Sequence, residues 1–157
     1  MPLADVSSTY TDIVETLFSS TIAAKAWLAS GAAALAIIQV LTASRMWGRL
    51  KRVIPLSFAT TKRIHQWSGR LAVLLTLPVF FHCVTILGFR TPDARIAVHS
   101  IAGSFVYGVL AAKLLVIRWK HYPHWVLPVL GGSLASVLTV LWLTSALWYF
   151  TNVRFGF

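Results

Sequence analysis

Two histidines lie in otherwise apolar sequence, on either side of the short polar break RTPDAR at residues 90–95. His82 and His99 are equally far from the bond between Arg90 and Thr91. The proline and aspartate in the break favour a tight reversal of the chain, so the flanking segments should form an antiparallel helical hairpin. At about 1.5 Å of rise per residue, both imidazoles should then lie at nearly the same depth.

Two neutral imidazoles, one from each of two neighbouring helices, are the axial ligands that the iron of haem b takes. Gly103 follows His99 by one helical turn on the same face, where a missing side chain would let a porphyrin lie against the backbone. Arg90 and Arg95 flank the turn and are placed to meet the carboxylates of such a cofactor. The spacing therefore predicts a haem b site with His82 and His99 as iron ligands.

Three neighbouring residues fit this prediction. Pro78, one turn before His82, removes a backbone donor and predicts a kink that re-aims the ligand. Thr85 and Ser100 are hydroxyl groups close in sequence to the two histidines, where each could orient a ring N–H.

Other interpretations of the histidines stay open at this point. An intramembrane histidine can simply form a hydrogen bond to a neighbouring helix. Zinc or copper held by His82, Cys83 and His99 is disfavoured, because successive residues of a helix point about 100° apart. Hydrolytic catalysis is disfavoured too, since no carboxylate lies within an apolar segment to act as acid or base.

A second cofactor site is a further open alternative. His65 begins the second apolar segment and is followed four residues later by Gly69, which repeats the His-x-x-x-Gly spacing of His99 and Gly103. A level partner on the next segment would be residue 116, which is a valine. His121 lies five residues further on, or about 7.5 Å of helix rise, and is a candidate partner, as is His124 at the start of the fourth segment. The other interpretation of His65 is an interfacial histidine that meets lipid headgroups or a quinone, so the number of haems is one or two.

Composition fixes the class of protein that must position these residues. Of the 157 residues, 57% are hydrophobic and 11% are charged, whereas a soluble domain has about 25% charged residues. Four apolar stretches each reach the roughly 20 residues that a membrane-spanning helix needs. We expect an all-α polytopic membrane protein whose four-helix bundle occupies 22–150, between a polar acidic tail at 1–21 and a short tail at 151–157. The four spans are expected at about 22–44, 66–89, 96–117 and 125–150.

The charged residues indicate an orientation in the membrane. Six basic residues and no acid lie between the first two spans, and Arg118 and Lys120 follow the third span. All four acidic residues lie in the N-terminal tail or in the 90–95 turn. Because basic loops stay cytoplasmic, we expect a multi-pass protein of the cytoplasmic membrane with both termini outside. The same topology accounts for the net charge of +10 without a nucleic-acid partner.

Three features of the sequence together suggest a known family: the four spans, the histidines of the two central segments, and the motif RIHQWSGRLAVL at 63–74. They resemble the b561-like and ferric-reductase-like four-helix membrane cytochromes b. That resemblance implies b-type haem held between helices by two histidines. By position, His82 and His99 match the ligand pair, and His65 matches the histidine of the HxWxGR motif. The first and fourth spans contain no histidine, which departs from the family pattern.

The resulting expectation is a membrane cytochrome b that carries electrons between a quinol or protein donor and an acceptor near the outer face. Nothing in the sequence resembles a flavin or nicotinamide domain, so a redox partner would be a separate protein. The alternative is a cofactor-free membrane anchor or scaffold subunit of a larger complex. A small transporter is disfavoured, because few polar residues lie within the spans.

Overall fold

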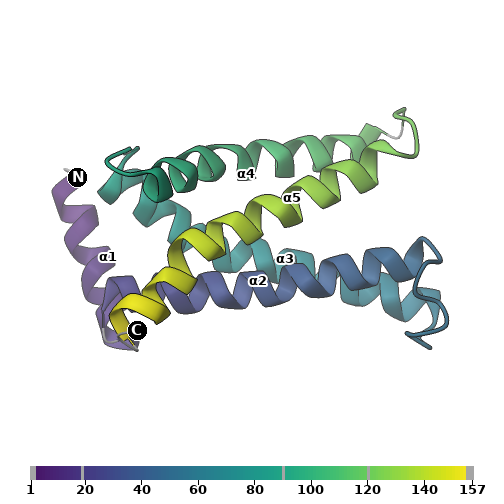
Figure 1. The fold of residues 1–157 in the computed structure, drawn as a ribbon, viewed down its shortest axis with the longest axis horizontal. Coiled ribbons are helices and arrows are strands. Elements are labelled where there is room, and N and C mark those ends of the chain that lie inside the picture. Colours follow the sequence, from purple (N-terminus) through teal and green to yellow (C-terminus); the bar gives the residue numbers. More distant parts are fainter. Residues whose placement is uncertain (1–2, 19, 90, 120, 155–157) are drawn as a thin grey trace.

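The chain is all-α in a computed structural model that describes residues 3–18, 20–89, 91–119 and 121–154. Within these residues, five α-helices and three short π-helical segments follow one another, and the long ones run side by side in a bundle (Figure 1). The elements are α1 (Leu3–Leu17), α2 (Thr21–Met46), α3 (Phe58–His82), η1 (Cys83–Leu87), α4 (Ala94–Trp119), α5 (Val126–Trp142), η2 (Leu143–Leu147) and η3 (Phe150–Arg154).

In the part of the chain that the structure describes, four helical stretches are long and apolar enough to cross a membrane, namely Thr21–Met46, Phe58–Thr85, Ala94–Trp119 and Val126–Val153. The prediction of an all-α chain with four long apolar helices is therefore confirmed. The second stretch begins at Phe58, well before the expected residue 66. The reason is a helix cap, because the Ser57 hydroxyl accepts a hydrogen bond from the Thr60 backbone N–H at 3.1 Å.

The N-terminal segment is helical, although the sequence predicted only a polar tail there. Tyr10, Val14 and Phe18 recur every four residues and stay partly buried, which is the stripe of an amphipathic helix. α1 lies across the end of the bundle where the chain also terminates (Figure 1). We call this the α1 end. The Tyr10 hydroxyl joins α1 to α3 by donating a hydrogen bond to the Pro78 carbonyl at 3.1 Å.

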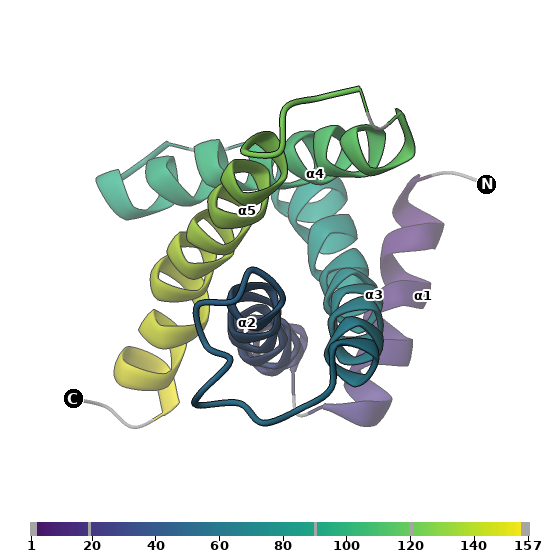
Figure 2. The same ribbon diagram turned by 90° about the vertical axis from the view of Figure 1, so that its right-hand side faces the viewer.

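The long helices pack as two consecutive pairs. α2 packs along α3, α4 packs along α5, and α2 also packs against α5, so that α2 lies between α3 and α5 (Figure 2). α3 and α4 run antiparallel, but they do not pack closely as the expected hairpin would. Side chains join them instead, because the Tyr107 hydroxyl donates to the Thr76 hydroxyl at 3.0 Å and the rings of Phe80 and Tyr107 lie 4.3 Å apart.

Small side chains let α2 approach the last helix closely at the α1 end. Ala23, Ala26, Ala146 and Tyr149 form a buried cluster. Close approach of helices through small residues is the usual packing mode in lipid. Nearby, the indole N–H of Trp142 donates to the Ser30 hydroxyl at 2.9 Å and ties α5 to α2. Many large apolar side chains on the outside of the bundle are exposed, as expected for helices covered by lipid.

Substitution of Ala26 should show how tightly these helices pack. Ala26 is 2% exposed, and a leucine there has no space, so Ala26→Leu should lower the free energy of unfolding by about 1–3 kcal/mol. Ala34, on the same helix, is exposed, and Ala34→Leu is the matched control that should have little effect. Thermal unfolding of the two variants in one detergent measures the difference, and equal stability would contradict the packing described.

Candidate functional site

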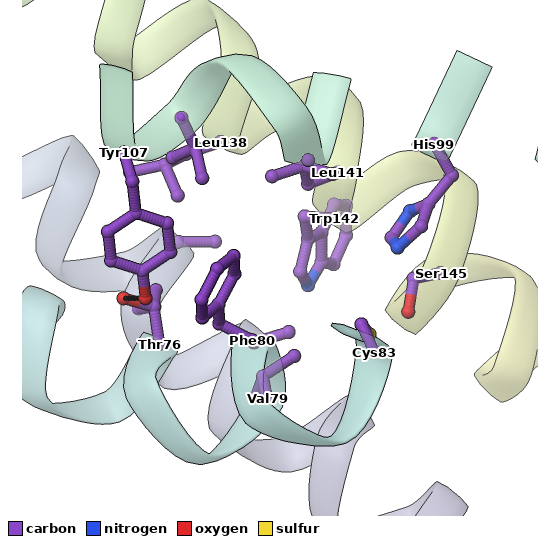
Figure 3. A pocket seen from close by; sticks show the side chains of 15 residues that line it. Thr76, Val79, Phe80, Cys83, His99, Tyr107, Leu138, Leu141, Trp142 and Ser145 are labelled. Atoms are coloured by element: carbon purple, nitrogen blue, oxygen red, sulfur yellow. Dashed lines mark hydrogen bonds between the residues drawn. The ribbon is translucent and has the colours of Figure 1, made fainter. Parts of the chain in front are cut away.

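A cavity of about 80 Å³ lies between α2, α3, α4 and α5 in the half of the bundle nearest the α1 end. His99, Cys83 and Ser145 are at one end of it, and Tyr107 and Thr76 are at the other (Figure 3). Its remaining wall is formed by apolar and small side chains, among which are Ala29, Ala32, Phe80, Gly103, Leu141 and Trp142. His99 and Gly103, which were predicted to share a site, therefore do line one cavity.

A threonine of the fourth span fixes the ring of His99. The Thr144 hydroxyl oxygen lies 2.7 Å from the Val140 carbonyl oxygen and 2.9 Å from Nδ1 of His99. A carbonyl oxygen only accepts, so the single hydroxyl proton is donated to Val140. The imidazole must then donate its Nδ1–H to Thr144, which leaves Nε2 with a free lone pair. A neutral imidazole in this tautomer is the form that binds a metal through Nε2.

The π-helical segment η2 gives Thr144 a second contact with α4. The Trp148 backbone N–H donates to the Ser145 carbonyl and not to that of Thr144. The Thr144 carbonyl instead accepts a hydrogen bond from Arg95 at 2.8 Å. Arg95 and His99 are one turn apart on α4, so both residues dock on Thr144.

This contact changes the role expected for Arg95. Its guanidinium is bound to the Thr144 carbonyl and lies 4.3 Å from the centre of the Trp148 ring. The side chain therefore joins α4 to the last helix, whereas the sequence predicted that it meets a cofactor carboxylate. Arg90, predicted for the same role, lies outside the described residues.

His82 is buried next to the cavity and does not line it. It is 5% exposed, and its ring lies 5.6 Å from the ring of Tyr10 on α1. Within the described chain, its Nδ1 is buried and has no hydrogen-bond partner. The next residue, Cys83, lines the cavity instead. Iron ligation by His82 stays a prediction, and the unpartnered nitrogen is the observation that keeps it of interest.

Two other residues expected near the site have different roles. A Cβ atom built on Gly103 would lie 3.8 Å from Leu141, which is ordinary van der Waals contact, so this glycine leaves only a little extra space. The Thr85 hydroxyl donates to the Phe81 carbonyl of its own helix at 2.6 Å and orients no described histidine ring. The role of Thr144 was not predicted, because hydropathy does not show how the fourth span is rotated about its axis.

His65 lies toward the opposite end of α3 and repeats the arrangement of His99. Its Nδ1 is 2.8 Å from the Thr42 hydroxyl of α2, and that hydroxyl lies 2.6 Å from the Ile38 carbonyl. The same reasoning assigns a proton to Nδ1 and a lone pair to Nε2. The Gln39 amide donates to the His65 carbonyl as well as to the Ser68 hydroxyl.

Gly69 and His121 do not complete a second site in the structure. Gly69 faces Gln39, whose amide would lie 3.2 Å from a Cβ built there, so the glycine makes room for a side chain of α2. His121 is exposed after the end of α4 and its Nδ1 bonds to the Trp119 carbonyl. The described residues contain no group of three or more His, Cys, Asp or Glu side chains that could hold a metal ion, so the geometry gives zinc or copper no support.

The role of Thr144 can be tested in the protein without any cofactor. Thr144→Val removes the hydroxyl but keeps the shape, so the Nδ1–H tautomer of His99 should lose its preference, and stability should fall by about 1 kcal/mol. Thr144→Ser should preserve the tautomer. Thr139, whose hydroxyl bonds only to the Ala135 carbonyl, supplies the control Thr139→Val. Nitrogen-15 NMR of labelled imidazoles reports the tautomer, and an unchanged signal in Thr144→Val would refute the assignment.

The attachment of α1 should depend on pH. Burial, with a smaller contribution from Cys83, raises the pKa of the Tyr10 phenol above 10.0. The neutral phenol therefore stabilises the docked helix below pH 10.0, and this stabilisation is lost as the pH rises through the raised pKa. Phenolate absorbance should show a late transition that Tyr10→Phe diminishes and that Tyr122→Phe, in the loop after α4, leaves unchanged. A Tyr10 transition at the ordinary pKa would contradict this contact.

Comparison with known proteins places the chain in a family. No curated protein and no solved structure is similar enough to be matched with it. Residues 5–157 match the Family of unknown function (DUF6529). Because this match covers nearly the whole sequence, including all four apolar helices and the cavity, the chain belongs to the DUF6529 family of unknown function.

Proposed function

We propose that the protein is a membrane cytochrome b that binds haem b in the cavity near the α1 end. The observation that carries the proposal is the state of His99. Its ring lies on the cavity wall, and the hydrogen bond to Thr144 leaves Nε2 with the lone pair that a haem iron requires. Bound haem would supply one-electron chemistry, and the protein would carry electrons between a quinol or protein donor and an acceptor near the outer face.

The chemistry of the available donors fits such a cofactor. His99 offers Nε2, and His82, the proposed second ligand, has a buried Nδ1 without a partner. The apolar wall, which includes Phe80, Leu141 and Trp142, would exclude water and so influence the reduction potential. Thr144 would keep the His99 ring oriented in the way that outer hydrogen bonds orient metal-bound imidazoles.

The cavity would have to widen to hold haem, and the interface between α3 and α4 is the one that would open. The cavity volume of about 80 Å³ is below the roughly 300–1,000 Å³ of ligand pockets. α3 and α4 meet through the contacts of Tyr107 with Thr76 and Phe80, without close backbone packing. Binding of haem would separate these two helices, which would leave both close helix pairs intact, and His82 would have to leave its contact with Tyr10 to act as a ligand.

The distribution of charge supports an orientation with both termini outside the cytoplasm. The basic loops at 47–57 and between α4 and α5 lie at the end opposite to α1 (Figure 1). Exposed Asp12 and Glu15 lie on α1. By the rule that basic loops stay in the cytoplasm, the haem would lie in the outer half of the cytoplasmic membrane.

A reduced-minus-oxidised absorption spectrum of the purified protein, with haem quantified per chain, tests the proposal. Wild type should show sharp b-type bands, and both His99→Ala and His82→Ala should abolish them. Cys83→Ser is the control beside His82, because Cys83 lines the cavity and the substitution should leave the bands unchanged. His121→Ala should also have no effect if one haem is bound, whereas two haems per chain would indicate a further site at His65.

Two results would count against the proposal. Colourless protein from cells able to supply haem would refute the cytochrome assignment and favour a cofactor-free anchor subunit. Bands that persist in His82→Ala but disappear in Cys83→Ser would refute the histidine pair and identify the thiolate as the second ligand.

A further inference from the structure

Lys25 lies one helical turn before the residues of α2 that line the cavity. It is in the second turn of α2, at the α1 end. Ala29 and Ala32 follow it by four and seven residues on the same helix face, and both line the cavity. The lysine side chain is therefore one turn above the cavity wall, on the side of the bundle where α1 crosses it.

The charge of Lys25 is directed at the site and has no described counterion. The ammonium group is close enough to interact electrostatically with His82, Cys83 and His99. Lys25 is partly buried, and it forms no hydrogen bond or ion pair with any residue that the structure describes. Removing an ammonium group from water is costly unless an anion or hydrogen-bond acceptor compensates, so an anionic ligand at this position would be stabilised.

The other described cation at this part of the site is already engaged. Arg95 is held by the Thr144 carbonyl and by the Trp148 ring. Lys113, the other partly buried lysine of the spans, lies toward the opposite end of α4 and interacts with His65. Lys25 thus remains as the described residue whose charge can meet a carboxylate at the α1 end of the cavity.

We infer that Lys25 binds a carboxylate of the porphyrin and so fixes which edge of the cofactor faces the α1 end. This inference rests on the proposed function, because the ligand is a haem propionate. It assigns to Lys25 the role that was predicted for Arg90 and Arg95. The group acts through charge, so arginine should replace it and glutamine should not.

The test compares two porphyrins that differ only at the carboxylates. Protein prepared in detergent from haem-deficient cells is titrated with haem and with haem dimethyl ester. Wild type should bind haem about tenfold more tightly than the ester. Lys25→Gln should lose this preference by weakening haem binding alone, and Lys25→Arg should retain it. Lys113→Gln is the matched control and should behave as wild type does.

A second readout is the midpoint potential of the haem-loaded protein. A nearby cation disfavours the more positive ferric state, so Lys25→Gln should lower the potential, whereas Lys113→Gln should shift it less. Equal binding of haem and ester by wild type, or equal weakening of both porphyrins by Lys25→Gln, would overturn the role of Lys25 and leave the cytochrome proposal intact. Failure of wild type to bind either porphyrin would overturn both.

Discussion

In a lipid environment every backbone carbonyl must find a donor within the protein, and in this chain three carbonyls find one on another helix. Arg95 of α4 binds the Thr144 carbonyl, Tyr10 of α1 binds that of Pro78, and Gln39 of α2 binds that of His65. Each bond crosses between two elements. Each also lies beside a histidine, since Thr144 contacts His99 and Pro78 precedes His82 by one turn. The bonds that join the helices thus also determine where the imidazoles lie.

The three intramembrane histidines differ in how completely their rings are held. His99 and His65 each donate Nδ1–H to a threonine whose own proton is used within its helix. His82 has no such partner within the described chain and packs against an aromatic ring. Two rings are therefore fixed in tautomer and direction, and the third is buried but not oriented. In a site that used both histidines, the ring of His99 would be oriented before the cofactor binds. The ring of His82 would be oriented only when the cofactor binds.

Hydropathy was sufficient to predict the four long apolar helices. Segments of this length and composition have no favourable place other than the interior of a membrane. Helical spacing was sufficient to suggest a shared site for His99 and Gly103. It could not show which residue near position 82 faces the cavity. The chain passes from α-helix to the π-helical segment η1 at Cys83, which changes the angular spacing of side chains, and Cys83 lines the cavity where His82 was expected.

The contacts of Thr144 and Thr42 and the position of Lys25 near the cavity could not be predicted from the sequence for a related reason. Each depends on the rotation of one helix against another, and uniformly apolar spans have no polar face to define it. The helix over Leu3–Leu17 was missed because it is too polar for a span, although Tyr10, Val14 and Phe18 follow helical spacing. The contact of Arg95 with the Thr144 carbonyl was not predicted either, because a charge at the edge of a site suggests a ligand before it suggests a backbone partner.

The two close helix pairs have a consequence for the order in which the molecule can assemble. α2 with α3, and α4 with α5, are joined by short connections, so each pair forms with a small loop-closure cost. The contact between α2 and α5 joins residues far apart in sequence, such as Ser30 and Trp142, and depends on both pairs being present. The cavity has walls from all four helices and no complete wall within either pair. The cavity therefore forms only when the two pairs come together through the contact between α2 and α5. Any molecule that binds in it meets a membrane protein whose helices are already paired.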